Sequence, residues 1–179
     1  NSNQNTYLIN GLTQLDPDFL LGDWFAHNTA HYHDKFSVIM FLVDSLGMPI
    51  DIGLIGIDVL LRILALVAIY KTICLLTRKY ALISFLLVLY IFILEKTLSV
   101  AGSYIFSSML QPSSFGSCFT LVGLLFFLRG QYFISGIFIA FAGYMHTNFL
   151  LLGFVYLGIA HLFLGFNGIV KRGLLQFSP

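Results

Sequence analysis

The chain has 179 residues, of which 58% are hydrophobic and 9% are charged, and its formal net charge is +1. Soluble domains average about 45–50% apolar and about 25% charged residues. This composition therefore excludes a disordered chain, a nucleic-acid binder that works through basic patches, and an ordinary cytosolic enzyme. An integral membrane protein remains. Because the chain begins with Asn1 rather than Met, we expect it to be a piece of a longer protein.

The first 50 residues are too polar to cross a bilayer. Residues 1–35 hold four of the eight acidic residues and three of the five histidines, together with the helix breakers Gly11 and Pro17. Residues 36–46 form an apolar run of about eleven residues, whereas a spanning helix needs about 20. This run predicts an interfacial or re-entrant helix that ends at Gly47 and Pro49. We expect the whole segment 1–50 to lie outside the membrane or at its surface.

Five apolar runs with tight turns between most of them follow this segment. Tight turns are typical of antiparallel neighbours in a helical bundle. We therefore predict an all-α fold, in which residues 51–179 form a polytopic transmembrane helical bundle of about five spans. The external N-terminal segment, residues 1–50, contains short interfacial helices. The predicted spans are 52–76, 80–94, 115–128, 132–144 and 148–166.

Basic residues predict the orientation of the chain. They follow the first span, lie between the third and fourth spans, and follow the fifth, so three alternate loops can all be cytoplasmic. The N-terminal segment, residues 95–114 and the turn at His146 then lie on the external face of a cell inner membrane. The basic residues used here are Lys71, Arg78, Lys79, Arg129, Lys171 and Arg172.

Asp23 and Asp16 are the candidate catalytic residues of the external segment. Asp23 precedes Trp24 and a helix-like stretch, so its simpler interpretation is a helix N-cap beside an interfacial tryptophan. The functional interpretation is a carboxylate that acts as a general base or holds a metal or a sugar.

His27 and His31 are candidate metal ligands, because a spacing of four residues on a helix can bind a transition metal. Asp34 could add an oxygen ligand. The simpler interpretation is a solvated, histidine-rich surface. A divalent metal is therefore a candidate cofactor and none is assigned, since phosphate-binding glycine loops and paired-cysteine metal motifs are absent from the sequence.

Asp58 and Arg62 lie four residues apart inside the first predicted span. Charged groups within a bilayer usually face the protein interior and pair with each other. The simpler interpretation is an intrahelical ion pair, and the functional one is a proton or ion pathway.

Glu95, Lys96 and His146 are the candidate substrate-binding residues at the other external positions. Glu95 and Lys96 open the loop 95–114, where the simpler interpretation is a helix cap and the functional one is contact with a phosphate or a sugar. His146 either caps the fourth span or faces the site.

Several short motifs together resemble the GT-C glycosyltransferase superfamily of polytopic membrane proteins. Residues 3–8 (NQNTYL), 15–18 (LDPD) and 22–25 (GDWF) are similar to a first external loop of that superfamily. Residues 111–116 (QPSSFG), 128–130 (LRG) and 143–147 (GYMHT) resemble its succession of loop, helix, basic turn, helix and histidine. The resemblance implies an acidic base in the first external loop. Where that base is expected the chain has Asn3, Gln4 and Asn5, so Asp23 and Asp16 are the nearest substitutes.

The resemblance implies transfer of a sugar from a polyprenyl-phosphate carrier at the external face. The expected partners are membrane lipid and a polyprenyl-phosphate-linked sugar, with no nucleic acid. The alternative is a non-enzymatic multi-pass membrane protein, either a transporter or a component of envelope assembly. A metal-dependent membrane hydrolase that uses His27, His31 and Asp34 is a third hypothesis.

Overall fold

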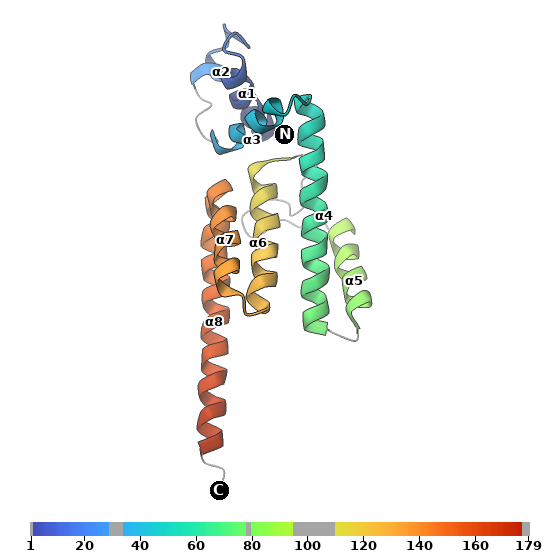
Figure 1. The fold of residues 1–179 in the computed structure, drawn as a ribbon, viewed down its shortest axis with the longest axis vertical. Helices are drawn as coiled ribbons and strands as arrows, with labels where there is room; N and C mark the ends of the chain where they lie inside the picture. Colours follow the sequence, from blue (N-terminus) through green and yellow to red (C-terminus); the bar gives the residue numbers. More distant parts are fainter. Residues whose placement is uncertain (1, 29–33, 78–79, 95–109, 177–179) are drawn as a thin grey trace.

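The structure, a computed structural model, describes residues 2–28, 34–77, 80–94 and 110–176. Within these ranges the chain forms eight helices and no strand (Figure 1), which confirms the all-α prediction. The helices are α1 (Ser2–Leu15), α2 (Trp24–Asn28), α3 (Asp34–Ser45), α4 (Ile50–Thr77), α5 (Ala81–Leu94), α6 (Pro112–Leu128), α7 (Tyr132–Met145) and α8 (Thr147–Gln176).

Each of the five predicted spans coincides with one helix, from α4 to α8. The largest difference is at the end of α8, which continues to Gln176 instead of ending near residue 166. The short run 36–46 is also helical, as α3. By contrast, short helices were expected within residues 1–50 but the bounds of α1 were not predicted, because its polar residues and Gly11 hide the helical pattern.

The helices α4 to α8 lie side by side along one axis (Figure 1). The central helix α6 contacts α4, α7 and α8, while α5 packs on α4. Close packing depends on small residues: a side chain at Gly123 would meet Ile139 and the carbonyl oxygen of Ser135. The buried thiol of Cys118 on α6 donates a hydrogen bond to the carbonyl oxygen of Leu61 on α4 at 3.4 Å. Small residues allow this close approach of helices.

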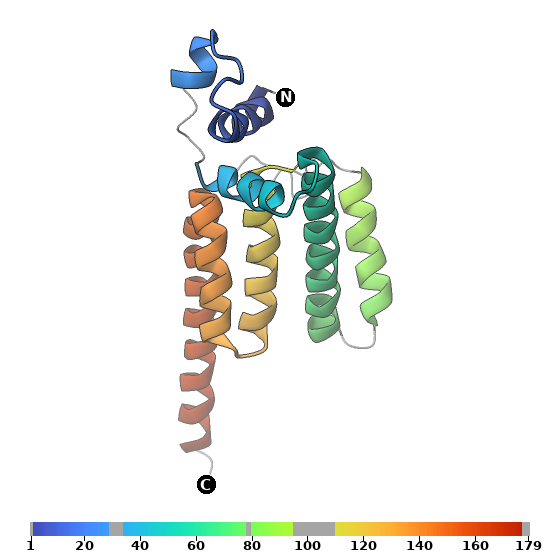
Figure 2. The ribbon, with the colours of Figure 1, turned by 45° about the horizontal axis from the view of Figure 1, so that its top comes forward.

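The N-terminal helices form a cap over one end of this bundle. The helix α3 lies across the end, and α1 packs on α3 (Figure 2). Phe36 and Met40 on α3 are fully buried, and the Phe36 ring lies 6.0 Å from the ring of Tyr7 on α1. Gly11 on α1 explains the close contact, because a Cβ atom there would overlap the sulfur of Met40. This packing stabilises α1 as a helix despite its glycine.

By length and composition, α4 is the helix in the described part of the chain that could cross a membrane. It has 28 residues, and its most apolar window has a mean hydropathy of 2.5. Only 28% of that window is buried inside the protein, so most of its residues are partly or fully exposed. The helices α6 and α7 are shorter, with 17 and 14 residues, or about 26 and 21 Å.

Candidate functional site

The end of the bundle beneath the cap contains His146, one of the predicted substrate-binding residues. His146 ends α7 in an extended conformation and immediately precedes α8. Its backbone N–H donates to Ala142 at 2.9 Å, and its carbonyl oxygen accepts from the N–H of Phe149 at 2.9 Å. Its imidazole meets the ring of Phe149 edge-on at 5.5 Å. The predicted role as the cap of this helix is therefore confirmed.

The imidazole of His146 is half-buried and its Nδ1 atom is buried without a hydrogen-bond partner in the described part of the chain. Burial lowers the pKa of His146, although a backbone hydrogen bond opposes this effect. The ring is therefore neutral near pH 7 and can accept a proton or a hydrogen bond.

A cation lies at the same junction between the cap and the bundle. The Nζ atom of Lys35, at the start of α3, is 4.5 Å from the centroid of the Tyr144 ring near the end of α7. Both side chains are exposed, and Tyr144 precedes His146 by two residues. Lys35 and Tyr144 therefore bring an ammonium group and a phenol together here, whereas the imidazole of His146 contacts Phe149. An ammonium group held at such a position can bind a phosphate or another anion.

Lys35 and Tyr144 were not among the predicted site residues. Lys35 directly precedes the apolar run 36–46, where a single lysine is typical of the end of a helix. Tyr144 is one of nine tyrosines in the chain. They are far apart in the sequence, so only the contact of α3 with α7 brings them together.

The predicted catalytic acids lie in the outer part of the cap. Asp23 is exposed, and its Oδ1 atom accepts a hydrogen bond from the N–H of Ala26 at 3.3 Å, as expected of the N-cap of α2. The Oδ1 atom of Asp16 accepts from the N–H of Asp18 at 3.1 Å. The helix α2 contacts α1, whereas α3 contacts α7, so α3 is the layer nearer to His146 (Figure 2).

Several other predicted residues are tested only in part. Glu95, Lys96 and His31 lie outside the described residues. His27 lies in α2, and its Nε2 atom is 3.1 Å from the carbonyl oxygen of Leu20. Asp34 begins α3. No three His, Cys, Asp or Glu side chains that could hold a metal ion are grouped within the described ranges.

The charged pair inside α4 has the geometry of an intrahelical ion pair. The Nε atom of Arg62 donates to Oδ2 of Asp58 at 2.7 Å. The two side chains are 35% and 18% exposed, so neither is fully enclosed by the other helices. The simpler interpretation of this pair, a bridge between successive turns of one helix, is therefore confirmed.

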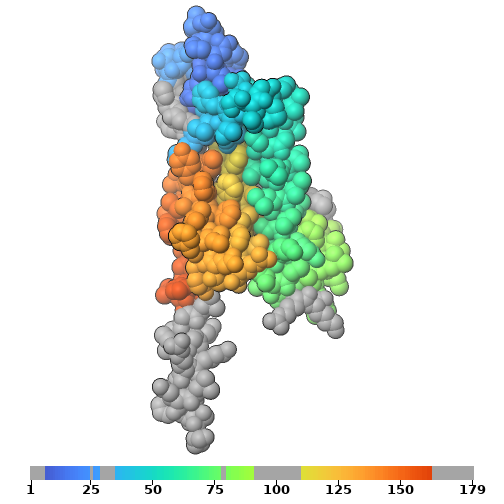
Figure 3. All heavy atoms as spheres, viewed as in Figure 1, coloured from blue at the N-terminus to red at the C-terminus, as the bar shows by residue number. Residues whose placement is uncertain are grey.

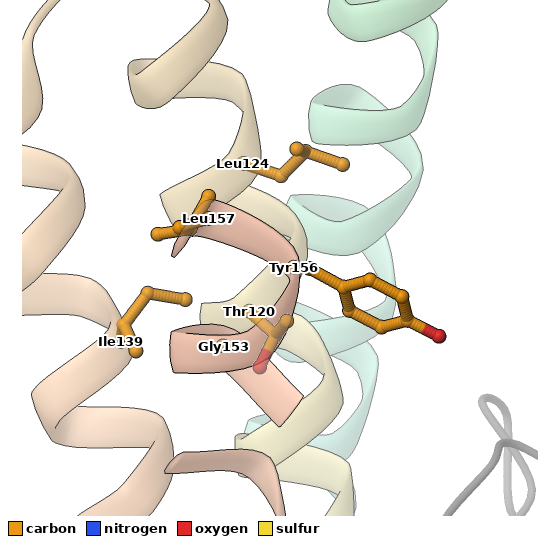
Figure 4. A pocket seen from close by; sticks show the side chains of 6 residues that line it. All are labelled: Thr120, Leu124, Ile139, Gly153, Tyr156 and Leu157. Carbon is orange, nitrogen blue, oxygen red and sulfur yellow. The ribbon is translucent and has the colours of Figure 1, made fainter. Parts of the chain in front are cut away.

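An apolar pocket of about 310 Å³ lies between α6, α7 and α8. The hydroxyl group of Thr120 on its wall donates to the carbonyl oxygen of Gly116 at 2.7 Å, and the hydroxyl end of Tyr156 points away from the other labelled side chains (Figure 4). The pocket therefore offers only apolar contacts. It is lined by Thr120, Leu124, Ile139, Gly153, Tyr156 and Leu157.

Comparisons of the chain with known protein families, with curated proteins and with solved structures found no match. The resemblance to the GT-C superfamily consequently stays a hypothesis that depends on the short motifs alone.

Proposed function

We propose that the chain belongs to a multi-pass membrane protein with α4 to α8 in the bilayer. The support is the uncovered apolar surface of these helices. Large apolar side chains are exposed on α4, α5, α7 and α8, for example Leu60 at 64%, Phe133 at 83% and Phe154 at 67%. Exposure of so large an apolar surface to water is unfavourable, whereas contact with lipid acyl chains is not. The short helices α6 and α7 fit if the bilayer thins locally or flanking side chains reach its surface.

The distribution of charge supports an external cap. The α6–α7 turn, which contains Arg129, lies at the same end of the bundle as the end of α4, and the cap lies at the other (Figure 1). Arginine and lysine favour cytoplasmic loops, and acidic residues have little influence on orientation. The cap contains one basic residue, Lys35, and would face the periplasm or the cell exterior.

The activity that we propose is glycosyl transfer from a polyprenyl-phosphate-linked sugar at the capped end. The observation that carries this proposal is the contact of Lys35 with Tyr144 between the cap and the bundle, two residues before His146. A phosphate carried on a lipid would reach this level of the membrane. Lys35 would bind it, and the neutral His146 would accept a hydrogen bond from the substrate.

In this reaction an acceptor hydroxyl oxygen forms a bond to the anomeric carbon of the sugar. The bond from that carbon to the carrier phosphate breaks, and the phosphate leaves with the electron pair. The hydroxyl proton passes to a carboxylate, for which Asp23 is the first candidate and Asp16 the second. Both lie in the outer part of the cap, so this role requires the cap to bring one of them to the bound substrate. Asp23 is exposed to solvent, so an acceptor can approach it.

The test is transfer of a radiolabelled sugar from a polyprenyl phosphate in membranes that contain the full-length protein. We expect Asp23→Asn and Lys35→Gln to reduce transfer at least tenfold, in the range of general-base and charge-assisted contributions. Asp44→Asn is the matched control, because Asp44 is also an exposed aspartate of the cap. The proposal would be contradicted if Asp23→Asn and Lys35→Gln transferred the sugar as fast as Asp44→Asn.

A non-enzymatic membrane protein is the second candidate function, and the Asp58–Arg62 pair favours it. Charged side chains at this depth often mark the pathway of a proton or an ion. Loss of a substrate flux in Asp58→Asn, with unchanged glycans in Asp23→Asn, would favour transport over glycosyl transfer.

A further inference from the structure

The helix α3 has an apolar surface on the side that faces away from the protein. Its buried face consists of Phe36, Ser37, Ile39, Met40 and Val43. The opposite side presents Val38, Phe41 and Leu42, with exposed fractions of 53%, 39% and 58%, and Leu46, 65% exposed, follows directly after the helix. We call these four large apolar side chains the outer row. A helix at a water-exposed surface normally has polar residues on this side. The outer row therefore requires an apolar partner.

The position of α3 restricts what this partner can be. The helix lies across the end of the bundle, at a large angle to α4 (Figure 2). Its buried face is fixed by α1 and by the start of α4, where Gly53 contacts the side chain of Val43. The outer row is therefore directed away from α1 and from Gly53, and α3 cannot rotate to bury it without breaking these contacts.

The outer row continues into the apolar surface of α4. The chain turns at Gly47, which has a φ of +67°, and enters α4, where Ile52 and Ile55 are 60% and 64% exposed. In the space-filling view α3 and the start of α4 form one continuous face (Figure 3). If α4 crosses a bilayer, lipid that surrounds its first turns also reaches the outer row.

The charges around the outer row fit a membrane interface. Lys35 is exposed at one end of α3, Asp44 is exposed near the other, and Asp51 is exposed at the start of α4. A lysine at this level can extend its ammonium group to lipid phosphates while its methylenes contact apolar surface. Tyr144, beneath Lys35, is an aromatic residue of the kind enriched at membrane–water interfaces.

We infer that α3 lies in the bilayer interface with its outer row in contact with lipid acyl chains. Helices of this kind bury their apolar face about 5–10 Å into the boundary between head groups and chains. In this position α3 anchors the cap beside Lys35 and His146 and fixes the height of that junction above the bilayer. The inference rests on the proposed membrane location and is independent of glycosyl transfer.

Spin labels on single cysteines of the full-length protein test this inference, with the protein in bilayers of phosphatidylethanolamine and phosphatidylglycerol. The informative label is at Leu42 in the outer row. Leu21, which is 71% exposed in the outer part of the cap, is the water-facing control, and Ile63, which is 55% exposed on α4, is the lipid-facing control. Collision with oxygen, which concentrates in lipid, is compared with collision with a water-soluble nickel complex.

We expect the ratio of oxygen to nickel collisions to be several-fold higher at Leu42→Cys than at Leu21→Cys, and close to that at Ile63→Cys. A ratio at residue 42 equal to that at residue 21, with residue 63 still in lipid, would overturn the inference and leave the membrane location intact. Spin–spin broadening at residue 42 would also overturn it, because a second copy of the chain would then cover the outer row. Val38→Cys repeats the measurement at a second position of the row.

Discussion

Gly53 offers a sharp test of how the cap is joined to the bundle. An alanine Cβ at this position would overlap Cγ1 of Val43 and would lie 2.9 Å from its Cγ2 and 3.2 Å from its Cβ. Unstrained carbon contacts are about 3.5–4.0 Å. Because Val43 is β-branched and 2% exposed, it cannot rotate away, so α3 and α4 must separate. Overpacking of this kind costs about 1–3 kcal/mol.

Gly56 is the matched control, since it lies in the same helix and nothing within 4 Å would meet its added Cβ. Replacement of either glycine by alanine gains about 0.8–1.0 kcal/mol of helix propensity. This gain cancels in the comparison, so Gly53→Ala should be less stable than Gly56→Ala by about 1–3 kcal/mol. For a chain of this size the difference in Tm is about 2–12 °C. Thermal unfolding of both full-length variants in one detergent measures it, and a Gly53→Ala protein as stable as Gly56→Ala would refute the packing of α3 on α4.

Three further predictions concern side-chain interactions of the described residues. Arg62→Gln should destabilise the protein more than the double replacement with Asp58→Asn, because it leaves the Asp58 carboxylate without its 2.7 Å partner in an apolar helix; additive losses of Tm would contradict the pairing. Burial lowers the pKa of His146, so the unfolded chain takes up this proton first as the pH falls, and stability should decrease below about pH 6.5. His146→Gln should reduce the difference in Tm between about pH 7 and pH 5, and an unchanged difference would assign the pH dependence to other groups. Tyr144→Leu should cost about 0.5–1 kcal/mol through loss of the contact with Lys35, and Lys35→Gln should remove most of this cost in a double-mutant cycle.

Much of the fold could be predicted because apolar runs and breakers agree in this sequence. The run before Gly47 and Pro49 became α3, and the turn at Arg129 and Gly130 separates α6 from α7 as expected. The bounds of α1 could not be predicted, since a glycine such as Gly11 disfavours a helix and the sequence does not show that Met40 packs against it. A local sequence pattern does not show which distant segments of the chain contact each other in the fold.

The candidate site was predictable only where local chemistry decides the outcome. The role of Asp23 as an N-cap follows from its place before a short helix, and the hydrogen bond to Ala26 confirms it. The contact of Lys35 with Tyr144 depends on how α3 crosses the end of α7, which no spacing along the chain encodes. The predicted roles of Glu95 and Lys96 in substrate binding stay predictions.

The central claim is that the cap and the α6–α7 turn lie on opposite sides of a membrane. Labelling of single cysteines in intact cells with a membrane-impermeant maleimide tests it directly, after replacement of Cys74 and Cys118. Leu21 in the cap and Gln131 after the turn are both exposed positions. We predict that Leu21→Cys reacts in intact cells and that Gln131→Cys reacts only after permeabilisation. Reaction of both cysteines from the same side would contradict the account.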